Sequence, residues 1–465
     1  MHKKKKIFIL LPDGIGLRNF AFTKFKQKGE QNNFGITYWN NTVFSINKEF
    51  GYNELKIENS SLHPFTTIFS RARKRIELNL FQKKFKSKVY KSYNFPQSYN
   101  GIKNLFKSLF VDLLVLCCSN QKGLKFVKKK IKKLERKNLK YTYCKSQLEK
   151  YKPKFVFCTN QRPTQAIAPL LAAQDLNIPT ATFIFSWDNL PKATMVVETD
   201  YYFVWSDYMK DELLKYYPFI SKNKVKVVGT PQFEPHFNKE LLVTKENFYS
   251  KYNLDLDKKY ICFSGDDKTT SPYDQFYLRD IAEAIIELNS KGFNLGIIFR
   301  RCPVDMSNRF DEVLSKYSDL IISINPDWRK MGDVWNTIMP TLNDYTILIN
   351  TIYHSELVIN VGSSMVFDYV CFNKPCIYFN YNSSRGNINN WDINKIYNYI
   401  HFNSMPSQSV VFWINSKHEI ITVIKNVLND SDKIVKTAKD WFKIINKEPA
   451  YSVSERIWDE INTII

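Results

Sequence analysis

The sequence contains no apolar run long enough to cross a membrane. A membrane-spanning helix needs about 18 or more predominantly apolar residues, and the longest candidate, residues 110–118, is shorter and includes Asp112. The basic start MHKKKK precedes a short apolar segment, 7–11, that ends in Pro-Asp-Gly. This pattern predicts a first β-strand and not an export signal, so we expect a cytoplasmic protein.

Spacings typical of metal sites and disulfide frameworks are also missing. The eight cysteines include no CxxC pair and lie mostly inside apolar runs. The six histidines show neither HxxxH nor HExxH spacing. We therefore expect neither a disulfide framework nor a zinc site, and no cofactor.

Acidic residues are in deficit. The chain has 67 Lys and Arg against 45 Asp and Glu, a formal net charge of +22, which favours an anionic partner. The excess is concentrated in 71–91 and above all in 121–140, where apolar residues recur at helical spacing: Leu124, Val127, Ile131 and Leu134. Such a cationic helix can lie on an anionic membrane or pack onto the protein by its apolar stripe, and the sequence leaves both open.

A high positive charge also suggests a nucleic-acid-binding protein, which is our alternative from a different class. The basic clusters lack the interleaved aromatic residues and glycines of single-strand platforms. No helix-turn-helix or zinc-finger pattern appears either. We therefore expect no nucleic-acid partner.

The first half of the chain alternates between strand-like and helix-like segments. The predicted strands are 7–11, 36–39, 155–158, 180–185, 201–205 and 225–228, with helices at 17–28, 163–174 and 208–216. Residues from about 65 to 150 read as long helices. This half predicts an α/β domain, 1–235, with a helical insertion.

A second alternation begins near residue 260. Its predicted strands are 261–264, 295–299, 320–324, 357–361 and 376–379, with helices at 275–290, 308–317, 345–352 and 365–371. We expect a second domain, 236–440, and a C-terminal helix, 441–465, that packs back on the first. The predicted fold class is α/β, with two doubly wound, Rossmann-like domains facing across a cleft where ligands of such sheets bind.

The stretch VINVGSSMVFDYVCFNKPCIYFNY, residues 358–381, reads as strand, turn, helix and strand. Gly362 breaks the first strand, and Ser363 or Ser364 is the expected N-cap. A helix that begins just past a parallel strand offers free N–H groups and a positive dipole end to an anion. A capping serine without any ligand is the other interpretation.

Two turns of the first domain carry chemistry at the ends of predicted strands. PDGIG, residues 12–16, combines the carboxylate of Asp13 with two glycines that allow a ligand close to the backbone, although a tight turn explains the glycines equally well. FSWDNLPKATM, residues 185–195, places four side chains in one polar loop: Trp187, Asp188, Asn189 and Lys192. A buried strand alone does not require that mixture.

Two turns of the second domain complete the set. FSGDDKTTSP, 263–272, contains Gly265 and Asp266, and FRRCPVD, 299–305, places two arginines past a strand, where guanidinium groups can clamp phosphate oxygens. Surface arginines that pair with Asp305 are the alternative. The turn that contains Ser363 and Ser364 is called the serine turn below. Together with it, these groups provide the amides, hydroxyls and arginine that a bound diphosphate requires.

The pattern RRCPVD, followed by LIN and SELVINVGSSMVFDYVCFNKPCIYFNY, resembles the donor half of GT-B glycosyltransferases and the related CDP-glycerol glycerophosphotransferases. SWDNLPKATM, VWSDYMKDEL and VVGTPQFEPHF resemble parts of bacterial transferases that build surface polysaccharides. The similarity covers most of 155–380 and, less closely, the first 25 residues; the helical insertion matches no family. Cys302 stands where the family's Arg-x-His-Pro turn has histidine.

The resemblance implies roles for individual residues. Arg300 would face the donor diphosphate, Ser363 and Ser364 would bind its oxygens, and Asp368 would reach the ribose. The full predicted donor set is Gly14, Gly16, Gly265, Asp266, Arg300, Ser363, Ser364, Met365 and Asp368. The predicted acceptor contacts are Arg162, Trp187, Asn189 and Lys192, and the catalytic base is Asp13 or, as second choice, Asp188.

The implied activity is transfer of a sugar from a nucleotide-diphosphate donor to a glycan or lipid-linked acceptor of the cell surface, such as O-antigen or capsule. We expect a metal-independent enzyme, because the DxD string at 255–257 reads as solvated loop. We also expect it to act on the inner face of the cytoplasmic membrane. Transfer of glycerol or ribitol phosphate is the leading alternative, and epimerisation of a nucleotide sugar is a third.

Overall fold

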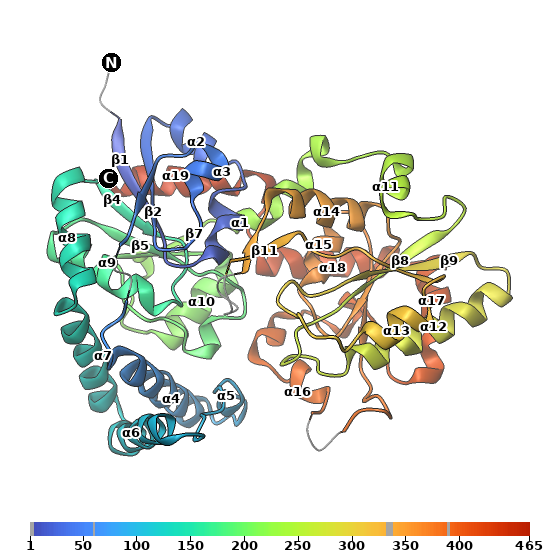
Figure 1. The fold of residues 1–465 in the computed structure, drawn as a ribbon, viewed down its shortest axis with the longest axis horizontal. Coiled ribbons are helices and arrows are strands. Elements are labelled where there is room, and N and C mark those ends of the chain that lie inside the picture. The colour runs from blue at the N-terminus through green and yellow to red at the C-terminus, as the bar shows by residue number, and fades with distance from the viewer. Residues whose placement is uncertain (1–3, 59–60, 332–337, 388–390) are drawn as a thin grey trace. The chain divides into compact units, whose positions relative to one another are not determined.

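The computed structural model describes residues 4–58, 61–331, 338–387 and 391–465. The chain forms two compact units (Figure 1): unit 1 comprises Met1–Pro231 and Ser452–Ile465, and unit 2 comprises Gln232–Tyr451. Each unit has its own sheet and its own core. The chain therefore begins in unit 1, builds unit 2, and returns to unit 1 with its last helix.

Unit 1 is built on a seven-stranded sheet with the order β3-β2-β1-β4-β5-β6-β7. All neighbouring strands are parallel. The inner strands are apolar and buried because helices cover both faces of a parallel sheet. The strands are β1 Lys5–Leu11, β2 Phe34–Asn40, β3 Glu54–Lys56, β4 Phe155–Cys158, β5 Thr180–Phe183, β6 Tyr201–Val204 and β7 Val225–Val227.

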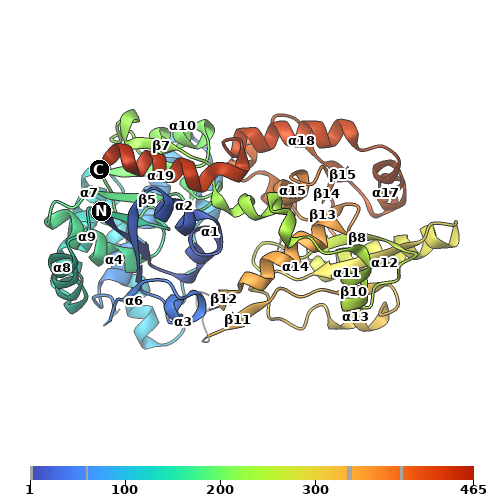
Figure 2. The same cartoon turned by 90° about the horizontal axis from the view of Figure 1, so that it is seen from above.

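The helices of the Rossmann-like part of unit 1 include the C-terminal helix. They are α1 Leu17–Phe20, α2 Phe25–Gln31, α3 Ile46–Phe50, α9 Ile167–Asp175, α10 Asp207–Tyr216 and α19 Val453–Ile464. The single helix predicted over 17–28 is thus two helices. In Figure 2, α19 runs beside α2, and Trp458 of α19 stacks on Phe25 and Phe34 at ring distances of 4.7 and 4.9 Å.

The predicted helical insertion is present as five helices. They are α4 Thr66–Phe85, α5 Val89–Ser92, α6 Ile102–Cys118, α7 Gln121–Arg136 and α8 Leu139–Tyr151. Three residues of the apolar stripe on α7, namely Leu124, Val127 and Ile131, are buried in one core cluster with strand residues such as Phe8. Of the two interpretations of this helix, packing by its stripe is the one observed.

Unit 2 is built on a six-stranded parallel sheet with the order β10-β9-β8-β13-β14-β15. A separate antiparallel pair, β11 and β12, lies between β10 and α14 in the sequence. The strands are β8 Lys259–Ser264, β9 Leu295–Arg300, β10 Ile321–Ser323, β11 Trp328–Lys330, β12 Ile338–Pro340, β13 Val358–Asn360, β14 Cys376–Phe379 and β15 Phe412–Ile414.

The four helices predicted between the strands of the second alternation are all present. The helices of unit 2 are α11 Lys245–Tyr252, α12 Asp274–Ser290, α13 Asp311–Lys316, α14 Leu342–Tyr353, α15 Met365–Val370, α16 Asn394–Tyr397, α17 Ile420–Asn429 and α18 Asp432–Ile445. The sequence assigned residues from 441 onward to the first domain, whereas α18 belongs to unit 2. Trp441 and Phe442 of α18 pack against Phe367 of α15.

Candidate functional site

Asp13 stands where β1 ends, and it precedes the short turn Gly14–Gly16. Because β1 and β4 are neighbours in the sheet, the residues that follow them lie together. Asn160 Nδ2 donates a 3.0 Å hydrogen bond to Asp13 Oδ2. The strand order reverses between β1 and β4, which is where open α/β sheets bind ligands. Asp13 therefore occupies the expected ligand-binding position of unit 1.

The carboxyl group of Asp13 has an unusual affinity for a proton. Burial raises its pKa from an ordinary 3.8 to about 6, although the hydrogen bond from Asn160 and the charge of Arg162 oppose the rise. The backbone N–H of Arg162 donates to Asn160 Oδ1 at 3.1 Å, which fixes the amide that Asp13 contacts. A carboxylate with a pKa near neutrality is suited to accept a proton as a general base.

The glycines that follow Asp13 have a packing explanation. A Cβ on Gly16 would lie 2.5 Å from Thr159 Oγ1 and 3.2 Å from the side chain of Leu11, too close for either neighbour to stay in place. Gly14 is also buried. The predicted contact of Gly14 and Gly16 with a donor stays a prediction.

The carboxylate of Asp188 is fully engaged inside its own loop. It accepts hydrogen bonds from Ser186 Oγ at 2.6 Å and Asn189 Nδ2 at 2.7 Å, and it forms an ion pair with Lys192. Asn189 is buried and accepts a 3.0 Å hydrogen bond from Gln161. This network orders the loop, and it leaves Asp13 as the better candidate for a base.

The helical insertion holds the loop that contains Asp188. Arg73 of α4 is buried and donates to the backbone oxygens of Ala193 at 3.0 Å and Met195 at 2.7 Å. Glu77, one turn further along α4, pairs with Arg73 at 2.6 Å. A buried pair of this kind is costly to break, because one partner would remain as an isolated charge. Helix α4 is therefore part of the support of the candidate site.

Four cations of unit 1, Lys74, Arg162, Arg73 and Lys192, influence one another. Burial lowers the pKa of Lys74 on α4 to about 8, and the charges of Arg162, Arg73 and Lys192 add to the effect. Like charges that disfavour one another in this way are stabilised by an anion. Arg162 and Lys192 were predicted to contact the acceptor, and Trp187, in the same loop as Lys192, is buried. Lys74 was missed, because it lies in the insertion, which matches no family.

Glu212 of α10 is a second group that sequence reasoning missed. It is buried, and burial raises its pKa to about 8, with Lys215 opposing and Asp188 adding to the rise. It lies within VWSDYMKDEL, which was noted only for its resemblance to other transferases. Its nearness to the Asp188 loop places a proton-holding group beside the candidate acceptor residues.

In unit 2, the turn after β13 depends on glycine. Gly362 has φ +67°, and a Cβ there would lie 3.0 to 3.2 Å from three side chains. Both the left-handed backbone and the lack of space require glycine at this position. The next residue, Ser363, donates its N–H to Asn360 Oδ1 at 2.8 Å, which fixes the start of the turn.

The two serines after Gly362 keep their hydroxyl groups largely free. Ser364 is the N-cap residue of α15, but its side chain makes no capping hydrogen bond. Among the described residues, Ser363 Oγ accepts one hydrogen bond, a long one of 3.5 Å from the N–H of Met365. Strong capping is therefore not what fixes these hydroxyls, which leaves them able to bind a ligand together with the first N–H groups of α15.

Asp368 of α15 pairs with a histidine. His236 Nε2 lies 2.9 Å from Asp368 Oδ1, and the side chain of His236 is completely buried. Sequence reasoning assigned Asp368 to the donor ribose and missed His236, although the histidine lies in the quoted segment VVGTPQFEPHF. The structure thus shows an imidazole–carboxylate pair next to the serine turn.

Arg300 ends β9 and is buried. Its Nη2 donates to Asp344 Oδ1 at 2.7 Å, and Asp344 also accepts a 2.7 Å hydrogen bond from Trp328 Nε1. Its Nη1 atom is buried and has no hydrogen-bond partner within the described ranges. Leaving a charged N–H unsatisfied costs about 1 to 3 kcal/mol or more, so this atom favours an anionic ligand.

The alternative interpretation expected Arg300 or Arg301 to pair with Asp305. Asp305 does pair with an arginine, but the partner is Arg309. Asp305 pairs with Arg309 at 2.7 Å, while Arg301 Nη1 donates to the backbone oxygen of Ser307 at 2.5 Å. Burial raises the pKa of the Cys302 thiol to about 12. Cys302 is therefore a neutral thiol and supplies no charge in the position where related turns have histidine.

The turn after β8 contains a buried pair of acids. The Asp266 N–H donates to Asp274 Oδ2 at 2.6 Å. Burial, together with the charges of Asp274 and Asp267, raises the pKa of Asp266 well above its ordinary value, and burial raises that of Asp274 to about 6. Asp266 therefore holds a proton more readily than an ordinary carboxyl group does. Next to it, Gly265 lies against Phe299.

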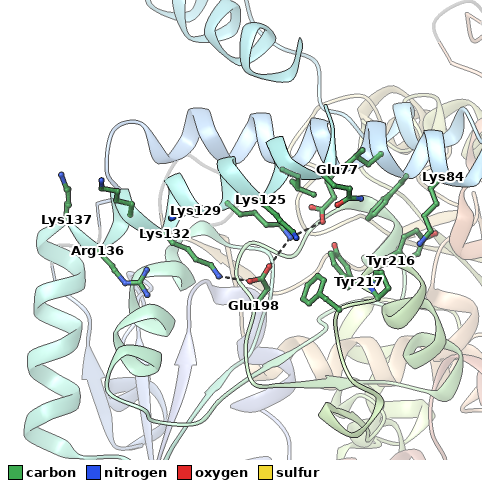
Figure 3. A pocket seen from close by; sticks show the side chains of 18 residues that line it. Glu77, Lys84, Lys125, Lys129, Lys132, Arg136, Lys137, Glu198, Tyr216 and Tyr217 are labelled. Atoms are coloured by element: carbon green, nitrogen blue, oxygen red, sulfur yellow. Dashed lines mark hydrogen bonds and ion pairs between the residues drawn. The ribbon is translucent and has the colours of Figure 1, made fainter. Parts of the chain in front are cut away.

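A cavity of about 980 Å³ lies in unit 1 and is lined largely by residues of the helical insertion (Figure 3). Helices α4 and α7 and the segment 216–219 form its walls. Its apolar floor includes Leu80, Phe81 and Leu124, and lysines of α7 surround it. No group of three or more residues suited to a metal ion occurs in the part of the chain that the structure describes.

No protein-family model matches the chain, and no curated protein matches it in sequence. Solved structures do match along its whole length. A putative UDP-N-acetylglucosamine 2-epimerase from Listeria monocytogenes aligns with a TM-score of 0.57 and 11% identity over 99% of this chain and 96% of that chain. S. aureus MnaA, in a UDP co-structure, aligns with a TM-score of 0.54 and 13% identity over 99% of this chain and 96% of that chain. The wall teichoic acid polymerase TagF aligns with a TM-score of 0.51 and 12% identity over 100% of this chain and 89% of that chain.

The chain has the GT-B fold. The predicted fold class, two Rossmann-like α/β domains of GT-B type, is confirmed by these matches and by the two parallel sheets. Identities of 11 to 13% establish the fold and nothing finer. Two sets of groups in this chain are suited to chemistry. Unit 1 has the carboxylate of Asp13, whose pKa is raised, and unit 2 has the serine turn and Arg300.

Proposed function

We propose that this GT-B protein is a glycosyltransferase that moves a sugar from a nucleotide-diphosphate donor to a hydroxyl of a cell-surface glycan or lipid-linked oligosaccharide. The observation that carries the proposal is Asp13, a buried carboxylate with a pKa of about 6 at the strand-order reversal of unit 1. Structures of similar fold support the donor class, since S. aureus MnaA was solved with UDP and a Neisseria meningitidis enzyme with UDP-GlcNAc.

Unit 2 is proposed to bind the donor. The hydroxyls of Ser363 and Ser364 and the first N–H groups of α15 bind oxygens of the diphosphate, and the unsatisfied Nη1 of Arg300 adds a charge-assisted hydrogen bond. Asp368, oriented by His236, binds the ribose. Gly265, Asp266 and Met365 complete the proposed nucleotide contacts.

Unit 1 is proposed to bind and activate the acceptor. Asp13 takes the proton of the acceptor hydroxyl as its oxygen bonds to the anomeric carbon, and the bond from that carbon to the diphosphate breaks. The diphosphate leaves with the electron pair, and hydrogen bonds from the serine turn and Arg300 stabilise its charge. Lys74, Arg162 and Lys192 form a cationic group that suits an acceptor carrying phosphate.

Two other enzyme activities remain as second candidates, because proteins of the same fold are named for them. The match to TagF supports transfer of a polyol phosphate, and the matches to UDP-GlcNAc 2-epimerases support epimerisation. The products separate the three. Sugar transfer releases a nucleoside diphosphate, polyol-phosphate transfer from a CDP-activated donor releases CMP, and epimerisation changes the sugar without releasing a nucleotide.

The test is a thermal-shift screen of nucleotides, nucleotide sugars and CDP-polyols, followed by product analysis with the ligand that stabilises best. A ligand at 100 times its dissociation constant adds about 2.7 kcal/mol to the free energy of unfolding. We expect a nucleoside diphosphate and its sugar conjugate to stabilise the protein. Stabilisation by none of these ligands, with retention of nucleic acid at moderate salt, would contradict the proposal and support the nucleic-acid alternative.

A further inference from the structure

Helix α6 of the insertion exposes an apolar surface. Of its 17 residues only Ser108, Val111 and Val115 are buried. Large apolar side chains with 39 to 81% of their area exposed are Ile102, Leu105, Phe106, Leu109, Leu113 and Leu116. Contiguous apolar patches of this kind mark interaction sites with proteins or membranes.

The exposed residues form one face of the helix. Successive residues of an α-helix are about 100° apart, so Phe106, Leu109 and Leu113 lie on one side while Val111 and Val115 lie on the opposite side. The Val111 and Val115 side joins the core of unit 1. Helix α6 is therefore anchored by a narrow buried side, and its wide apolar side has no cover within the described chain.

The surroundings of α6 are strongly cationic. Residues 66–150 contain 23 Lys and Arg against four Asp and Glu, so almost the whole net charge of the protein lies in the insertion. Asp112, the one acidic residue of α6, pairs with Arg75 and accepts hydrogen bonds from Tyr99 and Gln97 at 2.9 Å. Lys103 and Lys107 of α6 are exposed as well.

The cavity next to α7 shows how little of this charge is neutralised (Figure 3). Both carboxylates that line it already have cationic partners. Glu77 pairs with Arg73, and Lys128 and Lys132 lie 3.3 and 2.8 Å from Glu198. Lys125 and Lys129 are exposed and have no anionic partner within the described residues. The insertion thus presents an apolar helix face together with free cations.

We propose that the helical insertion docks on an anionic membrane surface, with the apolar face of α6 inserted between the lipid headgroups and the surrounding lysines facing the lipid phosphates. An amphipathic helix with an apolar face and lysine flanks binds lipid in this way. Charge argues against a second copy as the occupant, because two such insertions would bring two strongly positive surfaces together. The helices that the structure describes include none able to span a bilayer.

The docking surface differs from the one that the sequence suggested. The apolar stripe of 121–140 is buried in the core of unit 1 and cannot enter a bilayer. The apolar contact moves to α6, and α7 contributes charge alone. This proposal does not depend on the proposed transferase chemistry, because vesicle binding is measured without donor or acceptor.

The test is co-sedimentation of the full chain with vesicles of phosphatidylcholine alone or mixed with phosphatidylglycerol. We expect binding only to the mixed vesicles and release by added salt, since charge interactions are screened over about 8 Å at physiological ionic strength. The double variant Leu109→Glu with Leu113→Glu should lose binding. The matched control is Leu256→Glu, an equally exposed leucine in unit 2, which should bind like the unchanged protein.

Two further measurements make the result decisive. Thermal unfolding of the α6 variant should match that of the unchanged protein, because both leucines are exposed, so lost binding then reports on the surface itself. Unchanged vesicle binding by the variant, or equal binding to both kinds of vesicle, would overturn the proposal. So would a dimer in light scattering that becomes a monomer in the variant, because a second copy would then cover α6.

Discussion

At the scale of single residues, the side chains that matter are polar groups left incompletely paired inside the protein. Asp13 has one oxygen bonded to Asn160, and Arg300 has one nitrogen bonded to Asp344. Such half-satisfied groups cost free energy in the folded state and are common at functional sites. Each of them leads to a measurable expectation.

Replacing Asp13 by Asn should lower turnover by about 10²-fold or more, the usual loss when a general base is removed. The donor KM should change little, because Asn keeps the shape of the side chain and the donor is assigned to unit 2. Steady-state kinetics measures both. Asp188→Asn is the matched comparison: if it abolishes turnover while Asp13→Asn does not, the base is Asp188.

The same substitution should change stability in a pH-dependent way. Because the folded pKa of Asp13 is about 6 and its ordinary value is 3.8, the folded state binds the proton more tightly, and stability is lost as pH rises from 4 to 6. Above pH 6 the penalty is complete and amounts to at most about 3 kcal/mol. Asp13→Asn removes this penalty.

The free energy of unfolding of Asp13→Asn minus that of the unchanged protein should therefore increase from pH 4 to pH 7. Urea denaturation at several pH values measures the difference. A difference that stays constant over this range would show that Asp13 titrates normally and would remove the physical basis for its role as a base.

Replacing both Ser363 and Ser364 by alanine should raise the donor KM more than the acceptor KM, because hydrogen bonds to the diphosphate are lost while the backbone N–H groups remain. Kinetics with each substrate varied in turn measures this. Ser290→Ala, a change at the exposed end of α12, serves as the control. An unchanged donor KM in the double variant would exclude both serines from the donor site.

The sequence located the turns at the ends of strands but not the side chains that contact the residues in those turns. The end of a strand can be read from where an apolar run meets Gly362 or Asp13. The partners Asn160, His236 and Asp344 come from distant parts of the chain, and only the folded sheet brings them near. Lys74 was missed because it lies in the insertion, which resembles no family.

At the scale of elements, the sequence predicted that helices exist but not which face each one buries. Periodic apolar residues predict an apolar stripe, yet they do not say what covers it. Helix α7 has its stripe in the core, while α6, noticed only as a run too short to span a membrane, exposes the wider apolar face. The lysine-rich helix α7 buries its stripe, and the exposed apolar face lies on α6 of the same insertion.

This difference predicts opposite effects of the same kind of substitution on the two helices. Ile131→Asp places a charge in the core, which costs several kcal/mol, and should lower the melting temperature strongly. Leu109→Asp changes an exposed position and should leave it nearly unchanged. Calorimetry of both variants measures the effect. Equal melting temperatures would show that the α7 stripe is not buried.

At the scale of the whole molecule, the two alternations of strand and helix were enough to predict two parallel sheets. The sequence missed the edge strands β3 and β15, although β7, β10 and β13, which also have three residues each, lie within predicted strands. It also could not assign α18 and α19 to different units. The division depends on which aromatic residues Trp441 and Trp458 contact in the fold. The sequence around these two tryptophans does not indicate those contacts.

The return of the chain to unit 1 gives the last prediction. Trp458 of α19 is fully buried, stacks on Phe25 and Phe34, and donates a 2.7 Å hydrogen bond to the backbone oxygen of Phe25. Removing such a side chain costs about 3 to 5 kcal/mol. Trp458→Ala should therefore destabilise unit 1.

The matched variant is Trp441→Ala, which removes an equally buried tryptophan from unit 2. Hydrogen exchange followed by mass spectrometry should show faster exchange in β1, β2 and α2 for Trp458→Ala, and in α15 and α18 for Trp441→Ala. Each substitution leaves the core of the other unit intact, so the two patterns should be distinct. If both variants instead speed exchange equally throughout the chain, the two units unfold as one, and α19 stabilises the whole molecule through a single cooperative transition.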